Sequence, residues 1–182
     1  MHLMEEKTES KKVYQGKIFY ITEDMAKVED GTMVRRDVVH HSGGVCVVPL
    51  TEDNHVLLVR QFRYPNSVVT LEVPAGKLEP GEDPATCGRR ELREETGRTC
   101  NSYRDLGLMY PTPAYDTEIT YIYLAQDLSE EGAQDLDPEE FLDIVEMPLE
   151  TAVEKVLAGE IPDAKTQVAL LKTYILWKEN RL

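Results

Sequence analysis

"ELREETG", residues 91–97, is the stretch that decides the fold, because it places Glu91, Glu94 and Glu95 within five positions of one another. On a helix, residues three and four apart share a face, so these carboxylates project from one side. Like charges at this spacing cost stability unless a cation lies between them. Hard divalent ions prefer oxygen ligands, so a metal site is one interpretation, and a solvated helix of mixed charge is the other.

The flanking residues carry the signals of a helix over residues 84–96. Asp83 is a favourable N-cap, Pro84 suits the first helical position, and Gly97 suits the C-terminal stop. The preceding segment "PAGKLEPGED" (74–83) is rich in Gly, Pro and charge, which predicts a loop.

The loop and the helix together resemble the signature of the Nudix hydrolase family. In that signature a Gly is followed after five residues by Glu, and after seven more by Arg-Glu-aliphatic-x-Glu-Glu-x-Gly. The matching positions are Gly76, Glu82, Arg90, Glu91, Leu92, Glu94, Glu95 and Gly97. Arg98 stands where the pattern prefers an aliphatic residue. Matches at so many set positions make the signal a specific one.

The resemblance implies an α/β protein, with a Nudix α/β/α sandwich around a mixed sheet. It also implies an Mg²⁺-dependent enzyme, with Mn²⁺ as a substitute, that hydrolyses a nucleoside diphosphate linked to another moiety. The expected metal ligands are three helix carboxylates and one backbone carbonyl: Glu91, Glu94, Glu95 and Ala75. Residues expected to orient them, or to shape the loops around them, are Gly76, Glu82, Arg90, Gly97 and Pro113.

Two flanking features resemble ADP-ribose pyrophosphatases and related nucleoside diphosphate sugar hydrolases. "LVRQFRYP" (58–65) is similar to the strand before their signature, in which the arginine corresponding to Arg63 contacts substrate. The planar fork of Arg suits a phosphate, although a surface ion pair is the alternative. The expected substrate-binding residues are Arg63, Arg60, Lys77 and Glu118.

The second feature is "YPTPAYDTE" (110–118), in which Pro113 lies sixteen residues after Gly97, as a proline does in that branch. Ala114 stands where the branch has a glycine, which leaves the base and sugar of the substrate open. GDP-mannose, a dinucleotide or a nucleoside triphosphate are the alternative substrates, and a catalytically silent nucleotide-sensing module is the alternative outside the enzyme class.

Water attack on a pyrophosphate needs a proton acceptor. The resemblance implies a glutamate on a loop that precedes the strand predicted at 141–148, and Glu139 and Glu140 are in the matching place. Glu140 is favoured because it directly precedes the strand, and two solvated loop acids are the alternative. Glu94 is the third residue expected to be catalytic.

The N-terminal part, residues 1–41, is expected to form a β-strand extension, and residues 42–182 the Nudix domain. The first dozen residues are predicted to be disordered, with strands at 13–21 and 32–40 and a turn at 22–24. The resemblance implies that the extension is exchanged across a homodimer. Aromatic residues there either stack on a base or pack in the core: Tyr14, Phe19 and Tyr20.

The net charge of −14 argues against nucleic acid as a partner, but a bound cation can reverse the local field for a small anionic substrate. Residues 127–146 hold nine acids and no base, which is typical of a solvated segment. No apolar run is long enough for a membrane span or signal peptide, so we expect a cytoplasmic protein. The cysteines are expected to be reduced thiols: Cys46, Cys87 and Cys100.

Overall fold

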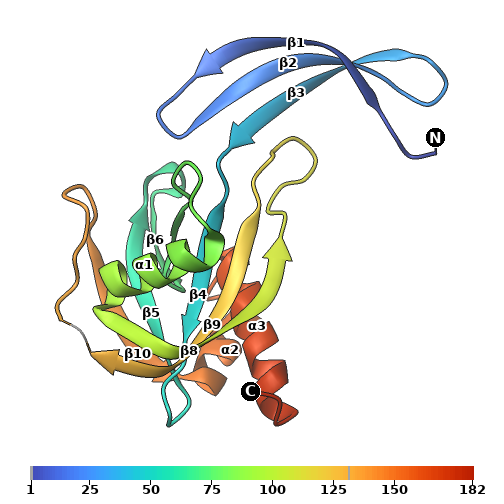
Figure 1. Ribbon diagram of the computed structural model, residues 1–182. Helices are drawn as coiled ribbons and strands as arrows, with labels where there is room; N and C mark the ends of the chain where they lie inside the picture. Colours follow the sequence, from blue (N-terminus) through green and yellow to red (C-terminus); the bar gives the residue numbers. More distant parts are fainter. Residues whose placement is uncertain (1, 131) are drawn as a thin grey trace. The chain divides into compact units, whose positions relative to one another are not determined.

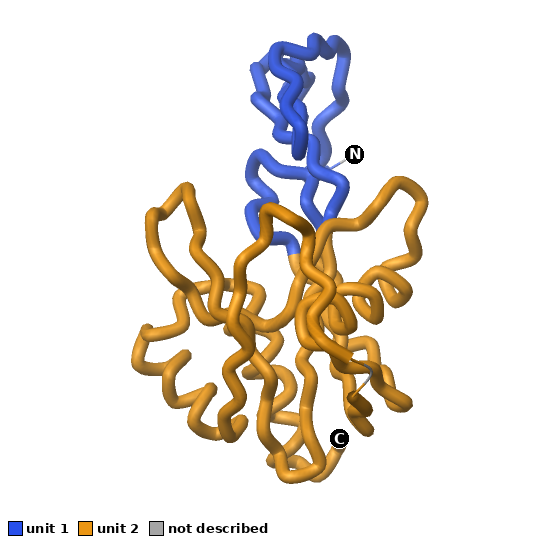
Figure 2. Tube along the Cα trace, turned by 90° about the vertical axis from the view of Figure 1, so that its left-hand side faces the viewer, with its two compact units in different colours: residues 1–43, 110–119 blue, residues 44–109, 120–182 orange. Residues whose placement is uncertain are grey.

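The computed structural model describes residues 2–130 and 132–182, so Glu131 of the acidic segment lies outside the described residues (Figure 1). The chain divides into two compact units, which Figure 2 colours separately. One unit comprises residues 1–43 and 110–119, and the other comprises residues 44–109 and 120–182.

The first unit contains an antiparallel sheet in the order β1 (Glu6–Gln15), β2 (Phe19–Lys27) and β3 (Met33–His41). The prediction of a disordered start is wrong, because β1 pairs with β2 along its whole length. The turn predicted at 22–24 is also wrong. Residues 22–24 pair with both neighbours, and the carboxylate of Asp24 accepts a 2.5 Å hydrogen bond from the Ser10 hydroxyl.

Residues 110–119 belong to the first unit through backbone hydrogen bonds to β3. The Val39 N–H donates to the Tyr115 carbonyl at 2.8 Å, and the Thr117 N–H donates to the Val39 carbonyl at 3.0 Å. The unit therefore includes a second stretch of chain that lies far from the N-terminus in sequence.

The second unit holds two sheets and three helices. The mixed sheet has the order β7 (Ala75–Lys77), β4 (Gly44–Pro49), β9 (Thr120–Glu130) and β8 (Arg98–Met109), with β4 and β9 parallel. The antiparallel sheet has the order β10 (Leu142–Pro148), β5 (His55–Arg63) and β6 (Val68–Glu72), and a 3₁₀ turn, Tyr64–Asn66, joins β5 to β6. The helices are α1 (Pro84–Thr96), α2 (Leu149–Leu157) and α3 (Ala164–Lys178).

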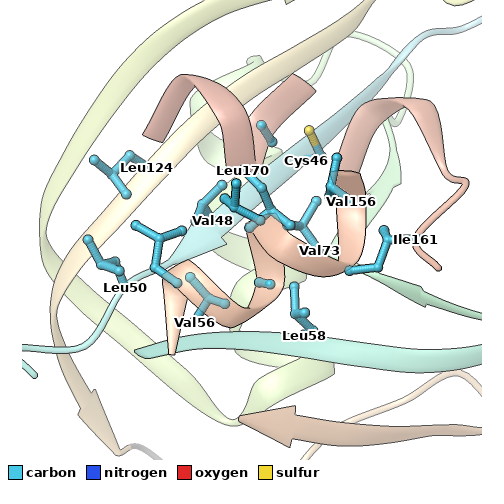
Figure 3. Packing of buried hydrophobic residues seen from close by; sticks show 14 of the residues in the cluster. Cys46, Val48, Leu50, Val56, Leu58, Val73, Leu124, Val156, Ile161 and Leu170 are labelled. Carbon is cyan, nitrogen blue, oxygen red and sulfur yellow. The ribbon is translucent and has the colours of Figure 1, made fainter. Parts of the chain in front are cut away.

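Side-chain alternation along β4 builds a core on each face of the mixed sheet. Cys46 and Val48 point into the larger core, where residues of α2 and α3 such as Leu170 pack (Figure 3). Val45 and Val47 point into the smaller core, which α1 closes. The helices thus cover both faces of the sheet, and the predicted α/β/α sandwich is confirmed.

The structure also describes the state of the cysteines and the character of the helices. The three cysteines are free thiols, with Cys46 and Cys87 buried. Within residues 2–130 and 132–182, no helix has the length and apolar character to cross a membrane.

Candidate active site

Helix α1 begins and ends where its sequence signals predict. The Asp83 carboxylate accepts a 3.0 Å hydrogen bond from the Thr86 N–H, and Pro84 occupies the first turn. Gly97 ends the helix at φ +67°, a conformation that glycine adopts without a Cβ penalty. The apolar anchors of α1 are Cys87 and Leu92, which are fully buried in the smaller core. This packing orients the carboxylates of the last two turns.

Arg90 gathers three acidic side chains around one guanidinium group. Its Nη1 donates to Glu91 Oε1 at 2.7 Å and to Glu94 Oε2 at 2.9 Å. Its Nε and Nη2 donate to the two carboxylate oxygens of Glu82, at 3.0 and 3.1 Å. Arg90 therefore balances part of the negative charge, and Glu82 holds the plane of the guanidinium.

Glu95 and Glu91 lie against the loop that carries Ala75 and Gly76. The Ala75 N–H donates to Glu95 Oε2 at 3.1 Å, and only 4% of Glu95 is exposed. A Cβ placed on Gly76 would lie 1.8 Å from Glu91 Oε1. Glycine at position 76 is thus a condition for the close approach of the Glu91 carboxylate to the loop.

The carboxyl groups of Glu91, which is partly buried, and Glu95, which is buried, hold their protons more tightly than exposed ones. Burial raises the pKa of Glu91 to about 7, with Arg90 opposing and the charges of Glu94 and Glu140 adding to the effect. Burial and the neighbouring Glu91 charge raise the pKa of Glu95 to about 8, and Glu140 contributes again. Burial thus disfavours the ionised form of both carboxyl groups, and the neighbouring acidic charges add to that effect.

This donor set fits a hard divalent cation. Its groups are carboxylate and carbonyl oxygens, and a bound cation would favour the ionised forms of Glu91 and Glu95, which burial and acidic neighbours disfavour. In the part of the chain that the structure describes, no three His, Cys, Asp or Glu side chains already form a metal-binding group. Arg90 lies between Glu91 and Glu94, so metal binding would require these side chains to turn away from it.

Arg63, expected to contact substrate, forms a bidentate ion pair with Glu72. Its Nε donates to Glu72 Oε1 at 2.7 Å and its Nη2 to Oε2 at 2.6 Å. The Arg63 side chain keeps 40% of its surface exposed, whereas that of Glu72 keeps 2%. The alternative interpretation of Arg63 as an ion-pair residue is therefore observed, and its exposed edge still leaves room for a ligand.

Glu140 lines a cavity of about 400 Å³ in the second unit. Arg60 borders the same cavity and donates to Asp143 Oδ2 at 2.7 Å, while Phe62 and Phe141 supply apolar walls. The Glu140 N–H donates to the Asp137 carbonyl at 2.9 Å, which forms a turn before β10. The charge of Glu140 is one of the smaller contributions that raise the pKa of Glu91 and of Glu95.

Backbone hydrogen bonds involve two of the remaining predicted residues, Lys77 and Glu118. The Lys77 carbonyl accepts a hydrogen bond from Arg90 Nη2 at 3.4 Å. Pro113 and Glu118 belong to the first unit, where the Glu118 N–H donates to Asp116 Oδ1 at 2.9 Å. Of the aromatic residues there, Tyr20 stacks on His40 with ring centroids 4.3 Å apart.

The loop after β9 is attached to the C-terminal end of α1, which the sequence did not reveal. Gln134 Nε2 donates to the Glu95 carbonyl at 2.6 Å, and the Asp135 N–H donates to the Glu94 carbonyl at 2.8 Å. These contacts satisfy carbonyls that a helix end leaves unpaired. They also connect the segment that carries Glu140 to the helix that carries the carboxylates.

A mixed sheet between helices, with clustered carboxylates on a loop and helix, agrees with the similarity of this chain to pyrophosphohydrolases, and the chain is an enzyme of that class. The profile described as "NUDIX domain" matches residues 40–169. The chain belongs to the Nudix family, whose hydrolases generally use divalent metal ions.

Two curated relatives are similar over nearly the whole chain. An ADP-ribose pyrophosphatase of Bacillus subtilis (strain 168) is 36% identical over 181 residues, covering 98% of this chain and 97% of the relative. A methanol dehydrogenase activator of Bacillus methanolicus is 36% identical over 170 residues, covering 92% of each. Among solved structures, one described as an ADP compounds hydrolase has a TM-score of 0.83 and 23% identity, covering 98% of this chain and 97% of that one. That likeness shows a shared fold.

Proposed function

We propose that the protein hydrolyses the pyrophosphate bond of ADP-ribose or a related nucleoside diphosphate sugar. The products are a nucleoside monophosphate and a sugar phosphate. The observation that carries this proposal is the arrangement of Glu91 and Glu95 against the Ala75–Gly76 loop, in a chain 36% identical to a named ADP-ribose pyrophosphatase.

The residues proposed to hold the metal are Glu91, Glu94, Glu95 and the carbonyl of Ala75. Mg²⁺ is the proposed ion, with Mn²⁺ as a substitute, because the donors are all oxygen atoms. When bound, such an ion neutralises phosphate charge and lowers the pKa of the attacking water. Arg90, held by Glu82, orients the Glu91 and Glu94 carboxylates from the side of the helix.

Glu140 is the proposed general base, and Glu139 is the alternative. Glu140 removes a proton from water as its oxygen attacks phosphorus, and the other phosphate departs with the electrons of the broken P–O bond. The charge of Glu140 contributes to raising the pKa of both Glu91 and Glu95, which supports this choice.

The proposed substrate-binding residues are Arg63, Arg60, Lys77 and Glu118. Arg63 offers a phosphate the edge of its guanidinium that faces away from Glu72. The cavity beside Arg60 has a volume in the range of small-molecule sites and adjoins Glu140, which supports seating part of the substrate there.

A substrate panel with Mg²⁺ or Mn²⁺ tests the proposal. Purified protein is incubated with ADP-ribose, GDP-mannose, a nicotinamide dinucleotide and ATP, and the products are separated by anion-exchange chromatography. We expect AMP and ribose phosphate from ADP-ribose, and none from the Glu95→Gln variant. Wild-type protein that cleaves none of the nucleoside diphosphate sugars would refute the proposal.

A dinucleotide is the second candidate substrate. One relative is named a methanol dehydrogenase activator, and many dehydrogenases use nicotinamide dinucleotides, in which a pyrophosphate joins two nucleotides. The same panel decides between them: a larger kcat/KM for the dinucleotide than for ADP-ribose would favour this candidate.

We also propose a cytoplasmic homodimer in which the N-terminal strands are exchanged. The side chains of β1 are exposed along its whole length, and apolar residues of the first unit such as Val13 and Tyr14 are about half exposed. Exposed apolar surface of this kind is typical of an interface. Multi-angle light scattering of the full chain and of a variant that begins at residue 42 measures the mass of each, and a monomeric full chain would refute the proposal.

A further inference from the structure

Arg63 presents one edge of its guanidinium because Glu72 occupies the other. Glu72 uses both carboxylate oxygens, one on Nε and one on Nη2 of Arg63. Among the hydrogen bonds of the described residues, none uses Nη1 of Arg63. A bidentate pair sets the orientation of the guanidinium plane as well as its position. The orientation of the Arg63 guanidinium, and so the direction in which it could donate to a phosphate, therefore depends on Glu72.

Glu72 in turn is a buried carboxylate that several groups hold in its charged form. It is 1% exposed, and it lies in β6 beside Thr70, whose hydroxyl donates to its Oε1 at 2.5 Å. Lys165 Nζ forms an ion pair with Oε2, the oxygen that Arg63 Nη2 also contacts. Burial disfavours the charge, but Arg63, Lys165 and Thr70 outweigh it and lower the pKa of Glu72 to about 2.

Lys165 occupies a position that its own helix does not favour. It lies in the first turn of α3, two residues after the N-cap Asp163, where the helix dipole is unfavourable for a cation. Its side chain is 18% exposed and also lies 3.1 Å from Asp163. In the same turn, the Thr166 hydroxyl accepts a 3.0 Å hydrogen bond from the Val73 N–H. The N-terminal turn of α3 is thus joined to Glu72, the last residue of β6, and to Val73, which follows it.

We propose that Lys165 is a positioning residue for substrate binding, which acts through Glu72 to orient Arg63 toward a phosphate of the substrate. This rests on the proposed function of Arg63 and deepens it. A cluster of buried charges gains little stability over a well-packed apolar one, so stability alone gives Lys165 little reason to be charged. Lys165 itself does not contact the substrate in this proposal.

A double-mutant cycle tests the proposal with inorganic pyrophosphate as the probe. Isothermal titration calorimetry in Mg²⁺ measures its binding to wild type, Lys165→Met, Lys165→Arg, Arg63→Ala and the Arg63→Ala/Lys165→Met double variant. Lys155→Met is the matched control, because Lys155 pairs with Glu160 on the surface of α2. Lys165→Gln replaces the Met variant should thermal melting show that the latter does not fold.

We expect Lys165→Met to weaken binding about tenfold, as loss of an outer-shell partner typically does, and to raise the KM for ADP-ribose more than it lowers kcat. Lys165→Arg should restore binding to within about twofold, and Lys165→Met should change nothing in the Arg63→Ala background. Wild-type affinity in Lys165→Met, an additive loss in the double variant, or no pyrophosphate binding by wild type would each overturn the inference.

The two proposals fail in different ways. Wild type that binds pyrophosphate, shows the coupled loss in the cycle and yet cleaves no nucleoside diphosphate sugar would refute the proposed function and leave the role of Lys165 standing. Wild type that cleaves ADP-ribose, with Lys165→Met unchanged in KM and pyrophosphate affinity, would refute the role of Lys165 alone.

Discussion

Replacement of Glu95 by Gln should stabilise the metal-free protein at alkaline pH while removing its activity. The pKa of Glu95 rises from an ordinary 4.5 to about 8 in the folded chain, because of burial and the neighbouring Glu91. A carboxyl group with a raised pKa favours folding when it is protonated. The cost of ionising it therefore appears above pH 4.5 and is complete above about pH 8.

The magnitude follows from the difference between the two pKa values. At about 1.4 kcal/mol for each pH unit, the full cost is about 5 kcal/mol above pH 8, about 3 kcal/mol at pH 7 and under about 1 kcal/mol at pH 5. Glu95 is 4% exposed, so solvent screens little of this effect. Gln has the same shape and keeps an oxygen to accept the Ala75 N–H, so the substitution removes the charge alone.

Urea denaturation in EDTA at pH 5, 7 and 9 measures the effect. We expect the Gln variant to exceed wild type in free energy of unfolding by an amount that grows with pH. Glu154→Gln, on the exposed face of α2, is the control and should show a difference that is constant with pH. A Glu95→Gln variant that is less stable than wild type at pH 9 would refute the electrostatic account of the site.

Substitutions at three further places in the chain test other parts of this account. Glu140→Gln should lower kcat at least about tenfold with little change in KM, and Glu139→Gln less than about twofold, in steady-state assays; equal effects would contradict the choice of base. Gly76→Ala should displace Glu91 and weaken Mg²⁺ binding about tenfold by calorimetry, because its Cβ would lie 1.8 Å from Oε1; unchanged affinity would contradict the close approach. Asp83→Ala should cost about 1 kcal/mol in urea denaturation through loss of the N-cap, whereas Asp83→Asn should cost much less.

The sequence predicted those parts of the fold whose causes are local. Helix α1 carries its own cap, its proline and its terminal glycine, so its bounds follow from residues 83–97. Strand β1 was missed because its sequence lacks apolar alternation. Its side-chain contacts with β2 include polar ones, such as that of Ser10 with Asp24, and a ring contact between Tyr14 and Phe19 near its end. The pairing of residues 110–119 with β3 joins distant parts of the chain, and no local signal marks it.

The candidate site likewise has parts that the sequence predicted and parts that it did not. The carboxylates of α1 were predictable from helical spacing, but the restraints on them were not. A glutamate inside the apolar run "VVTLEV" was a signal of a buried ion pair, yet Lys165, which completes that pair, lies 93 residues further along the chain. Gln134 likewise contacts α1 across 39 residues, at a distance that no sequence spacing encodes.

Gln134 and Asp135 are hydrogen-bonded to α1, so the length of the segment between Asp135 and Glu140 limits the distance of Glu140 from that helix. Its four intervening residues span at most about 17 Å when extended, and the turn at Asp137 shortens that reach. The number of residues between Asp135 and Glu140 thus limits how far Glu140 can lie from α1. Inserting or deleting a residue in this segment would move the proposed general base, while the helix that carries the proposed metal ligands would stay as it is.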